Sequence, residues 1–294
     1  MPSYKTHAIH GEMLFPFMDK KTDINIEDLK VFCMGPDLIG AVNPTLFRIQ
    51  HTSNTKDFFI TLINYIKKNN LQYNSEVIAF LYGQLEHFVL DLIVHPLIYY
   101  MTEGLPNDHI VTGHGLVEHL IDDYVIKKYG FNKNSFHKLG LVDENTFNAI
   151  NYTYEKVYKS SNVGLQYSAG ILSLKFYDRV VRNDKTNIIS TITDFINLGD
   201  IKYHDEEELA TPYLNIEHDT WQNPETGQAY NLSFDDLWLR ANDLLLELIY
   251  DVNNYLYLDK PFNNQLVLNN TSYLTGLPCG FGQSKQFVKK YKRD

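Results

Sequence analysis

The stretch Leu85-Glu86-His87-Phe88-Val89-Leu90-Asp91-Leu92-Ile93-Val94-His95-Pro96 decides the fold, because it places metal-binding side chains inside an apolar run that begins near Val77. In a helix, His87, Asp91 and His95 lie one turn apart on the same face. A single buried His–Asp pair is usually only a core hydrogen bond. Three such residues in register are different, because each needs its own compensation for desolvation. The stretch therefore predicts a helix that presents a metal site.

A second pair of ligand types follows in His114-Gly-Leu-Val-Glu118, where the imidazole and the carboxylate are again four residues apart. On a helix this spacing presents two ligands to one zinc ion. Cys33 and Cys279 are the only cysteines and lie far apart, so neither a disulfide framework nor a thiolate zinc site is supported. We therefore expect nitrogen and oxygen ligands.

Length and composition favour a globular, helical protein. With 294 residues, 44% of them apolar, the chain can bury a large core, and we expect a single domain over residues 1–294. Pro and Gly are scarce, which favours helices over disorder or repeats. The formal net charge of −10 argues against a general nucleic-acid or anionic-membrane binder, since both need clustered cationic charge.

Periodic apolar positions predict helices along most of the chain. The predicted helices cover residues 4–18, 55–69, 76–94, 111–129, 143–160, 163–182, 185–198 and 233–257, with a brief helix inside 19–30. Pro96 is expected to bend or restart its helix, and residues 99–110 and 199–232 are expected to form irregular loops. The predicted fold class is all-α, a compact multi-helix domain.

The start of the chain, Met-Pro-Ser-Tyr-Lys-Thr-His, lacks the basic start and apolar stretch of a secretory signal. No run of apolar residues reaches the roughly 18 that a membrane span needs. We therefore expect a cytoplasmic protein without a transmembrane segment. The sequence also lacks a Gly-rich phosphate loop, a nucleophile elbow and a Cys/His nucleophile arrangement, which sets those enzyme classes aside.

Further ligand-type residues stand near the N-terminus. Gly35-Pro36 forces a turn just before Asp37, whose commonest structural role would be a helix N-cap. Asp37 precedes His51 by fourteen residues, and a Thr6-His7 pair stands before both. Together with the two helical spacings, these motifs, all within residues 4–125, resemble the zinc-dependent phospholipase C family. That family is all-helical, and its fold also includes single-strand-specific nucleases.

The resemblance implies a zinc centre, whose ligands in family order are His7, Asp37, His51, His87, Asp91, His95, His114 and Glu118. One zinc ion would be held by Asp37, His51, His87 and Asp91, and a second by His95, His114 and Glu118. A third would lie between His7 and Asp91, with Asp91 bridging. In the family the free amino terminus of the mature enzyme completes that third site, whereas here six residues precede His7. We expect two tightly held zinc ions and a weak third.

The resemblance also bears on the substrate. Family enzymes that cleave phosphatidylcholine surround the choline cation with aromatic and acidic side chains, and the matching positions here are Leu38 and Arg48. Choline specificity is therefore not implied. Arg48 is better matched to a phosphate or another acidic group, so it is the candidate substrate-binding residue. The expected partner is a phosphate-ester substrate, with phospholipids in that class.

The leading functional hypothesis is a zinc-dependent hydrolase of phosphoric esters, phospholipase C-like, with zinc-activated water as nucleophile and Asp37 as the candidate catalytic base. One alternative is a non-catalytic, metal-stabilised helical protein that binds a partner through the loop 199–232. Another is a nuclease of the same fold, which the acidic charge and the absence of a basic stripe disfavour.

Overall fold

The structure is a computed structural model that describes residues 4–102, 114–130, 141–182 and 213–280. The helices before the first gap are α1 (Tyr4–Leu14), α2 (Ile26–Phe32), η1 (Gly35–Ile39), α3 (Pro44–Thr52), α4 (Thr55–Lys68), η2 (Leu71–Tyr73) and α5 (Ser75–Thr102). Those after it are α6 (His114–Tyr129), α7 (Glu144–Tyr158), α8 (Val163–Arg182), α11 (Phe234–Leu258) and α12 (Gln265–Leu268). The strands in this part of the chain, β1 (Trp221–Gln222) and β2 (Ala229–Tyr230), form one antiparallel hairpin. The predicted all-α fold class is confirmed.

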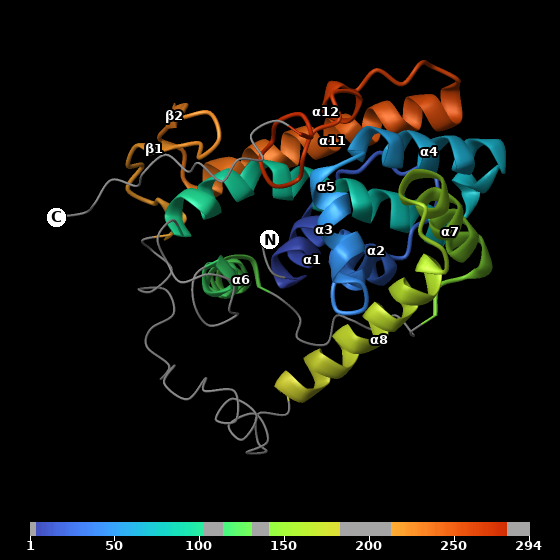
Figure 1. Cartoon of the computed structure of the whole chain (residues 1–294), viewed down its shortest axis with the longest axis horizontal. Coiled ribbons are helices and arrows are strands. Elements are labelled where there is room, and N and C mark those ends of the chain that lie inside the picture. Colours follow the sequence, from blue (N-terminus) through green and yellow to red (C-terminus); the bar gives the residue numbers. More distant parts are fainter. Residues whose placement is uncertain (1–3, 103–113, 131–140, 183–212, 281–294) are drawn as a thin grey trace.

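Helix α5 lies at the centre of the molecule, and most of the other helices pack around it (Figure 1). The side chain of Asn74 caps its start by accepting a hydrogen bond from Val77 N at 2.9 Å. The helix then packs against α1 and α2 on one side and α11 on the other. Because α5 is covered on all sides, its polar residues lie inside the protein.

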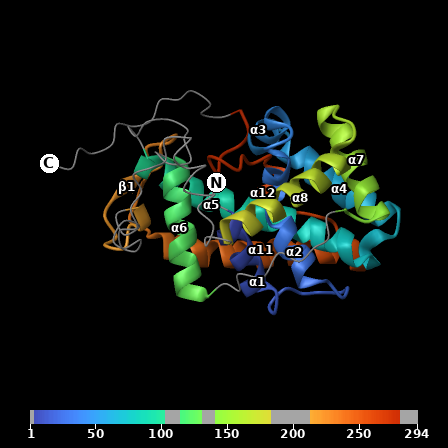
Figure 2. The same ribbon diagram turned by 90° about the horizontal axis from the view of Figure 1, so that it is seen from below.

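Two further groups of helices complete the core around α5. Helices α4 and α7 pack against each other, and α8 packs against α7 and η1 (Figure 2). Helix α6 is seen end-on in Figure 1 and along its length in Figure 2, and it contacts α1 and α5. Thus η1, the segment that carries Asp37, is held between α5 and α8.

By length and composition, α5 is the one helix in the described residues that could cross a membrane. In its most apolar window, however, 94% of the residues are buried inside the protein. That burial is typical of the core helix of a globular fold.

The structure corrects several predicted boundaries. Helix α5 does not restart at Pro96 but continues to Thr102, so residues 99–102 are helical rather than loop. Proline costs a helix about 3 kcal/mol or more, and here burial of the following turn, including Leu97 and Ile98, outweighs that cost. Helix α1 ends at Leu14 rather than residue 18.

Other differences concern short elements. Helix α3 was not predicted, although Asn43 caps it and Pro44 occupies its first position. The predicted brief helix within 19–30 is α2, which runs on to Phe32. Residues 213–232 of the predicted irregular loop contain the β1–β2 hairpin. The predicted helix 185–198, the remainder of that loop and residues 103–110 lie outside the described residues.

Candidate metal centre

Helix α5 carries three of the predicted ligands on one face. His87, Asp91 and His95 follow at intervals of one turn, and all three are fully buried. Neither carboxylate oxygen of Asp91 nor Nε2 of His95 has a hydrogen-bond partner among the described residues. Buried polar atoms are normally paired, so these unpaired lone pairs point to a cation.

The first group of ligands gathers around His87 and Asp91. Asp37 comes from η1 and His51 from the last turn of α3. His51 Nε2 lies 3.3 Å from His87 Nε2, 3.4 Å from Asp37 Oδ1 and 3.6 Å from Asp91 Oδ2. His87 Nε2 lies 3.2 Å from Asp91 Oδ2 and 3.7 Å from Asp37 Oδ1. Four atoms bound tetrahedrally to one zinc lie about 3.3–3.6 Å apart, so the distances around His51 and His87 suit a shared ion.

Hydrogen bonds on the far side of each ring fix which nitrogen of His51 and His87 faces the centre. His51 Nδ1 donates to Phe47 O at 2.7 Å, and His87 Nδ1 donates to Cys33 O at 3.1 Å. A carbonyl can only accept, so both Nδ1 atoms carry the hydrogen, and in the metal-binding form of each ring Nε2 presents its lone pair to the centre. Two lone pairs that face each other at 3.3 Å repel unless a cation lies between them.

The position of η1 depends on Gly35. Its φ is +53°, and a Cβ added there would lie 2.4–2.7 Å from ring and Cβ atoms of His87. Only glycine combines this backbone conformation with so close an approach. Gly35 thus lets the chain turn directly over His87 and places Asp37 beside it.

We expect Gly35→Ala to weaken zinc binding at the first group by about 10–100-fold, the loss seen when groups that orient metal ligands are altered. The added methyl group must displace the His87 ring or η1. Titration of metal-free protein with zinc against a chromophoric chelator measures the effect. Gly130→Ala is the matched control, because Gly130 also has positive φ but a Cβ built there meets no atom within 4 Å in the described part of the chain. Equal affinities in the two variants would contradict this role of Gly35.

The second group joins α5 to α6. His114 Nε2 lies 2.8 Å from Glu118 Oε1, and the imidazole of His95 stacks on that of His114 with ring centroids 5.6 Å apart. One ligand atom from each residue lies within 4.8 Å of the others. The side chains of His114 and Glu118 are 23% and 14% exposed, whereas those of the first group are almost fully buried apart from Asp37. Three ligands at a partly exposed position leave room for a further ligand, the arrangement of a catalytic zinc site.

The protonation of His95 and His114 suits metal binding. Burial lowers the pKa of both imidazoles below the ordinary value, so both rings are neutral. The pKa of the Asp91 carboxyl is also lowered, but not by burial. Burial alone would raise the pKa of this carboxyl, but the facing His95 and His87 outweigh burial, and the pKa lies well below its usual range. The second group therefore offers two neutral imidazoles, and the Asp91 carboxylate beside it is ionised.

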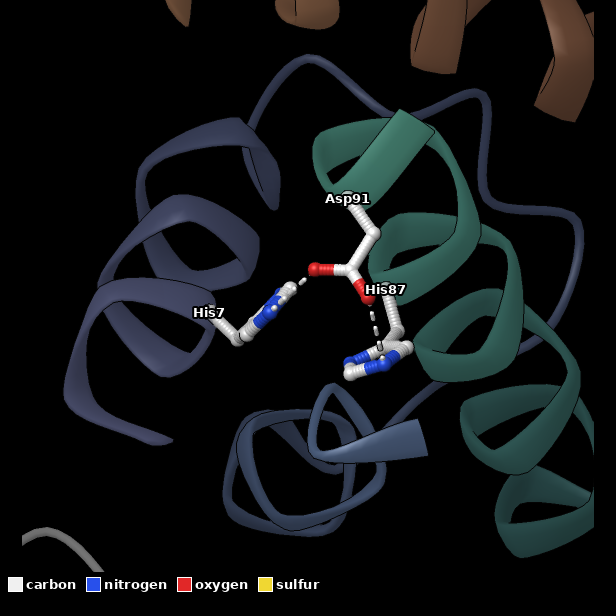
Figure 3. A group of neighbouring side chains, drawn as sticks. All are labelled: His7, His87 and Asp91. Carbon is white, nitrogen blue, oxygen red and sulfur yellow. Dashed lines mark ion pairs between the residues drawn. The ribbon is translucent and has the colours of Figure 1, made fainter. Parts of the chain in front are cut away.

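Asp91 also faces His7 of α1, as the third predicted position requires (Figure 3). His7 Nε2 lies 3.3 Å from Asp91 Oδ1, while Asp91 Oδ2 faces His87. Burial alone would lower the pKa of His7, but Glu86 and Asp91 outweigh it and raise the pKa to about 10. A metal ion at His7 must therefore compete with a proton.

Glu86 was not predicted as part of the site, and together with His10 it supports this third position. Glu86 is fully buried and accepts from His7 Nδ1 at 3.2 Å and from His10 Nδ1 at 2.8 Å. His10 Nε2 in turn lies 2.9 Å from Asn242 Oδ1 of α11. A carboxylate that holds the far nitrogen of a ligand histidine orients the ring and raises its basicity. The signal was present as a glutamate inside an otherwise apolar run and a histidine one turn after His7.

The structure brings the eight predicted ligands into three groups, two of which share His87. Arg48 is exposed on α3, about one turn before His51. Leu38 is buried in η1. Asp37 is 12% exposed, so it is the most accessible ligand of the first group.

Comparison with known proteins adds one finding. A family model described as zinc dependent phospholipase C matches residues 6–165. No curated protein and no solved structure matches the chain. The matched residues span more than half of the chain and include every predicted metal ligand.

Proposed function

Because the chain belongs to the zinc-dependent phospholipase C family, we propose that it hydrolyses phosphoric esters, phospholipids among them, at the centre formed by η1, α3, α5 and α6. The observation that carries this proposal is the convergence on Asp91. Its two oxygens face different groups of ligands, and neither oxygen has a hydrogen-bond partner among the described residues. A carboxylate in that position can hold two cations at a short, fixed separation.

Zinc ions supply Lewis acidity, which polarises phosphoryl oxygens and makes water a competent nucleophile near neutral pH. The residues of the chain do the remaining work. His51, His87 and Asp91 fix the buried part of the centre, and the partly exposed His114 and Glu118 mark the side that substrate can approach. The burial of α5 excludes water from the rest of the centre and strengthens every charge interaction within it.

Asp37 has the geometry of a general base in this scheme. Its Oδ1 faces His51 and His87, and its side chain is more exposed than those of the other first-group ligands. Its second oxygen, Oδ2, is the atom assigned to accept a proton from the attacking water. Because Asp37 is also assigned as a zinc ligand, its basicity is reduced and its contribution is smaller than that of the ions.

Arg48 is assigned to the phosphate group of the substrate, because it is exposed on the same helix as His51. We expect Arg48→Ala to raise KM about 5-fold while changing kcat less, since an exposed charged contact contributes about 1 kcal/mol. Steady-state kinetics on one phosphodiester checks this. The control is Arg240→Ala, an equal charge change at an exposed position of α11, which should leave both constants unchanged. An unchanged KM in Arg48→Ala would remove Arg48 from the site.

A substrate panel tests the proposed function. Zinc-loaded protein is offered phosphomonoesters, phosphodiesters and phospholipids, each with and without a chelator. The proposal expects cleavage of at least one class, lost with chelator and restored with zinc. If the loaded protein cleaves nothing in the panel, the hydrolase proposal fails, and a metal-stabilised partner-binding protein becomes the better account.

A further inference from the structure

The segment from Asn270 to Cys279 closes on itself just after α12. Ser272 N donates to Leu277 O at 2.7 Å, and Cys279 N donates to Asn270 O at 2.7 Å. We call residues 270–279 the closing loop. It lies outside the 6–165 region that the family model matches, and no predicted ligand belongs to it.

The closing loop contacts a ligand from each of the two main groups. Tyr273 N donates to His51 O at 3.1 Å, and Ser272 Oγ donates to the same carbonyl at 3.1 Å. Tyr273 O accepts from His95 Nδ1 at 3.2 Å. The two polar backbone atoms of one residue are therefore bonded to ligands of different groups.

The bond to His95 has a chemical consequence. Because Tyr273 O can only accept, His95 Nδ1 must carry the hydrogen, which leaves its Nε2 lone pair for the group shared with His114 and Glu118. The bonds to His51 act on the backbone instead. They hold the last turn of α3, where His51 is bonded through Nδ1 to Phe47 O.

The loop is fitted to α5 at the point where Pro96 interrupts the hydrogen bonding of that helix. Pro96 has no N–H to donate to Leu92 O, four residues earlier. Gly276 lies against this carbonyl with φ +66°, and a Cβ built there would be 2.9 Å from Leu92 O. The buried Tyr273 ring packs on Phe88 and His51, with centroid distances of 5.0 and 5.2 Å. Pro96 and Gly276 thus let the closing loop approach the backbone of α5 closely at Leu92, between the ligands Asp91 and His95.

We propose that the closing loop is a positioning element of the metal centre, in which Ser272 and Tyr273 orient His51 and His95 and so couple the two groups. The inference rests on the metal sites of the proposed function, but not on which ester is cleaved. Removing a partner that orients a metal ligand costs about 10–100-fold in metal affinity. Displacement of this loop should therefore weaken both groups together.

The test compares Gly276→Ala with Gly280→Ala. Both glycines have positive φ, but only Gly276 lies against the backbone of α5, whereas a Cβ at Gly280 meets no atom of the described residues within 4 Å. Zinc affinities are measured on the full chain by stepwise competition with a chromophoric chelator. Gly276→Ala should bind zinc about 10–100-fold more weakly than the wild type at both tight sites, and Gly280→Ala should match the wild type.

A milder variant, Ser272→Ala, decides the matter if Gly276→Ala fails to fold as judged by circular dichroism. It removes one of the two hydrogen bonds to His51 O and leaves the Tyr273 O bond to His95 in place. We expect weaker zinc binding at the first group and unchanged binding at the second. The proposal is overturned if Gly276→Ala folds and binds zinc as tightly as the wild type. If Gly276→Ala does not fold, the proposal is overturned by wild-type zinc affinity in Ser272→Ala. A lower melting temperature of either variant does not change these conclusions. Absence of zinc binding in the wild type would instead overturn the proposed function.

Discussion

Replacing Asp91 by Asn should abolish hydrolysis while leaving the helices intact. The substitution keeps the shape and one acceptor oxygen but removes the charge that faces His87, His7 and His95. We expect activity to fall on the order of 10³-fold, the upper end of the loss when one preorganised electrostatic group is removed. The centre should also lose tightly held metal. Kinetics, elemental analysis and far-UV circular dichroism of the same sample check the three parts.

The control for this prediction is Asp243→Asn, which makes the same change at an exposed position of α11 and should leave activity and metal content unchanged. Removal of such a group is expected to slow cleavage by much more than about 10-fold. An Asp91→Asn variant whose cleavage rate stays within about 10-fold of the wild type would therefore contradict the bridging role of Asp91. Loss of activity together with loss of helical signal would instead show that Asp91 is needed for folding.

Removal of the metal should lower the melting temperature on the order of 10 °C. Each tight site stabilises the folded chain by about 4 kcal/mol when free zinc is 1,000 times the dissociation constant, and in a domain of this size 1 kcal/mol shifts melting by about 2 °C. The stabilisation is local to the helices that the ligands join, namely α1, η1, α3, α5 and α6. Thermal unfolding with and without a chelator measures the shift.

Two comparisons make the melting test specific. Zinc added back in excess of the chelator should restore the wild-type transition. The chelator should shift Asp91→Asn much less than the wild type, because that variant has already lost metal. If the chelator strips the metal and melting is unchanged, the centre is not integral to the fold.

The ligand-bearing face of α5 could be predicted because its signal is local. His87, Asp91 and His95 are spaced by one turn in a run too apolar to leave them unpaired, and the structure places them together. The same held for His114 and Glu118 on α6. The more distant His7, Asp37 and His51 were placed by family resemblance, because nothing in their local sequence states what they contact.

The remaining features depend on contacts between distant segments. Tyr273 lies more than 170 positions from His95 along the chain, and the carbonyl that binds His95 Nδ1 has no side-chain signature. Pro96 was expected to bend or restart α5, but the helix continues through it, because the local rule for proline omits the burial of the following turn. Helix α3 is short and weakly apolar overall, so capping by Asn43 and the turn at Pro44 were its clearest signals.

The zinc content of protein purified without added metal or chelator tests the central claim most directly. Asp37, His51 and His87 form one candidate site with Asp91 beside it, and His95, His114 and Glu118 form another. At the third position we expect weaker binding, because the raised pKa of His7 lets a proton compete with the metal. Elemental analysis should therefore find about two zinc ions per chain, with a third only when zinc is supplied in excess. The account is contradicted if folded protein holds fewer than about one metal ion per chain and does not take up zinc when zinc is added.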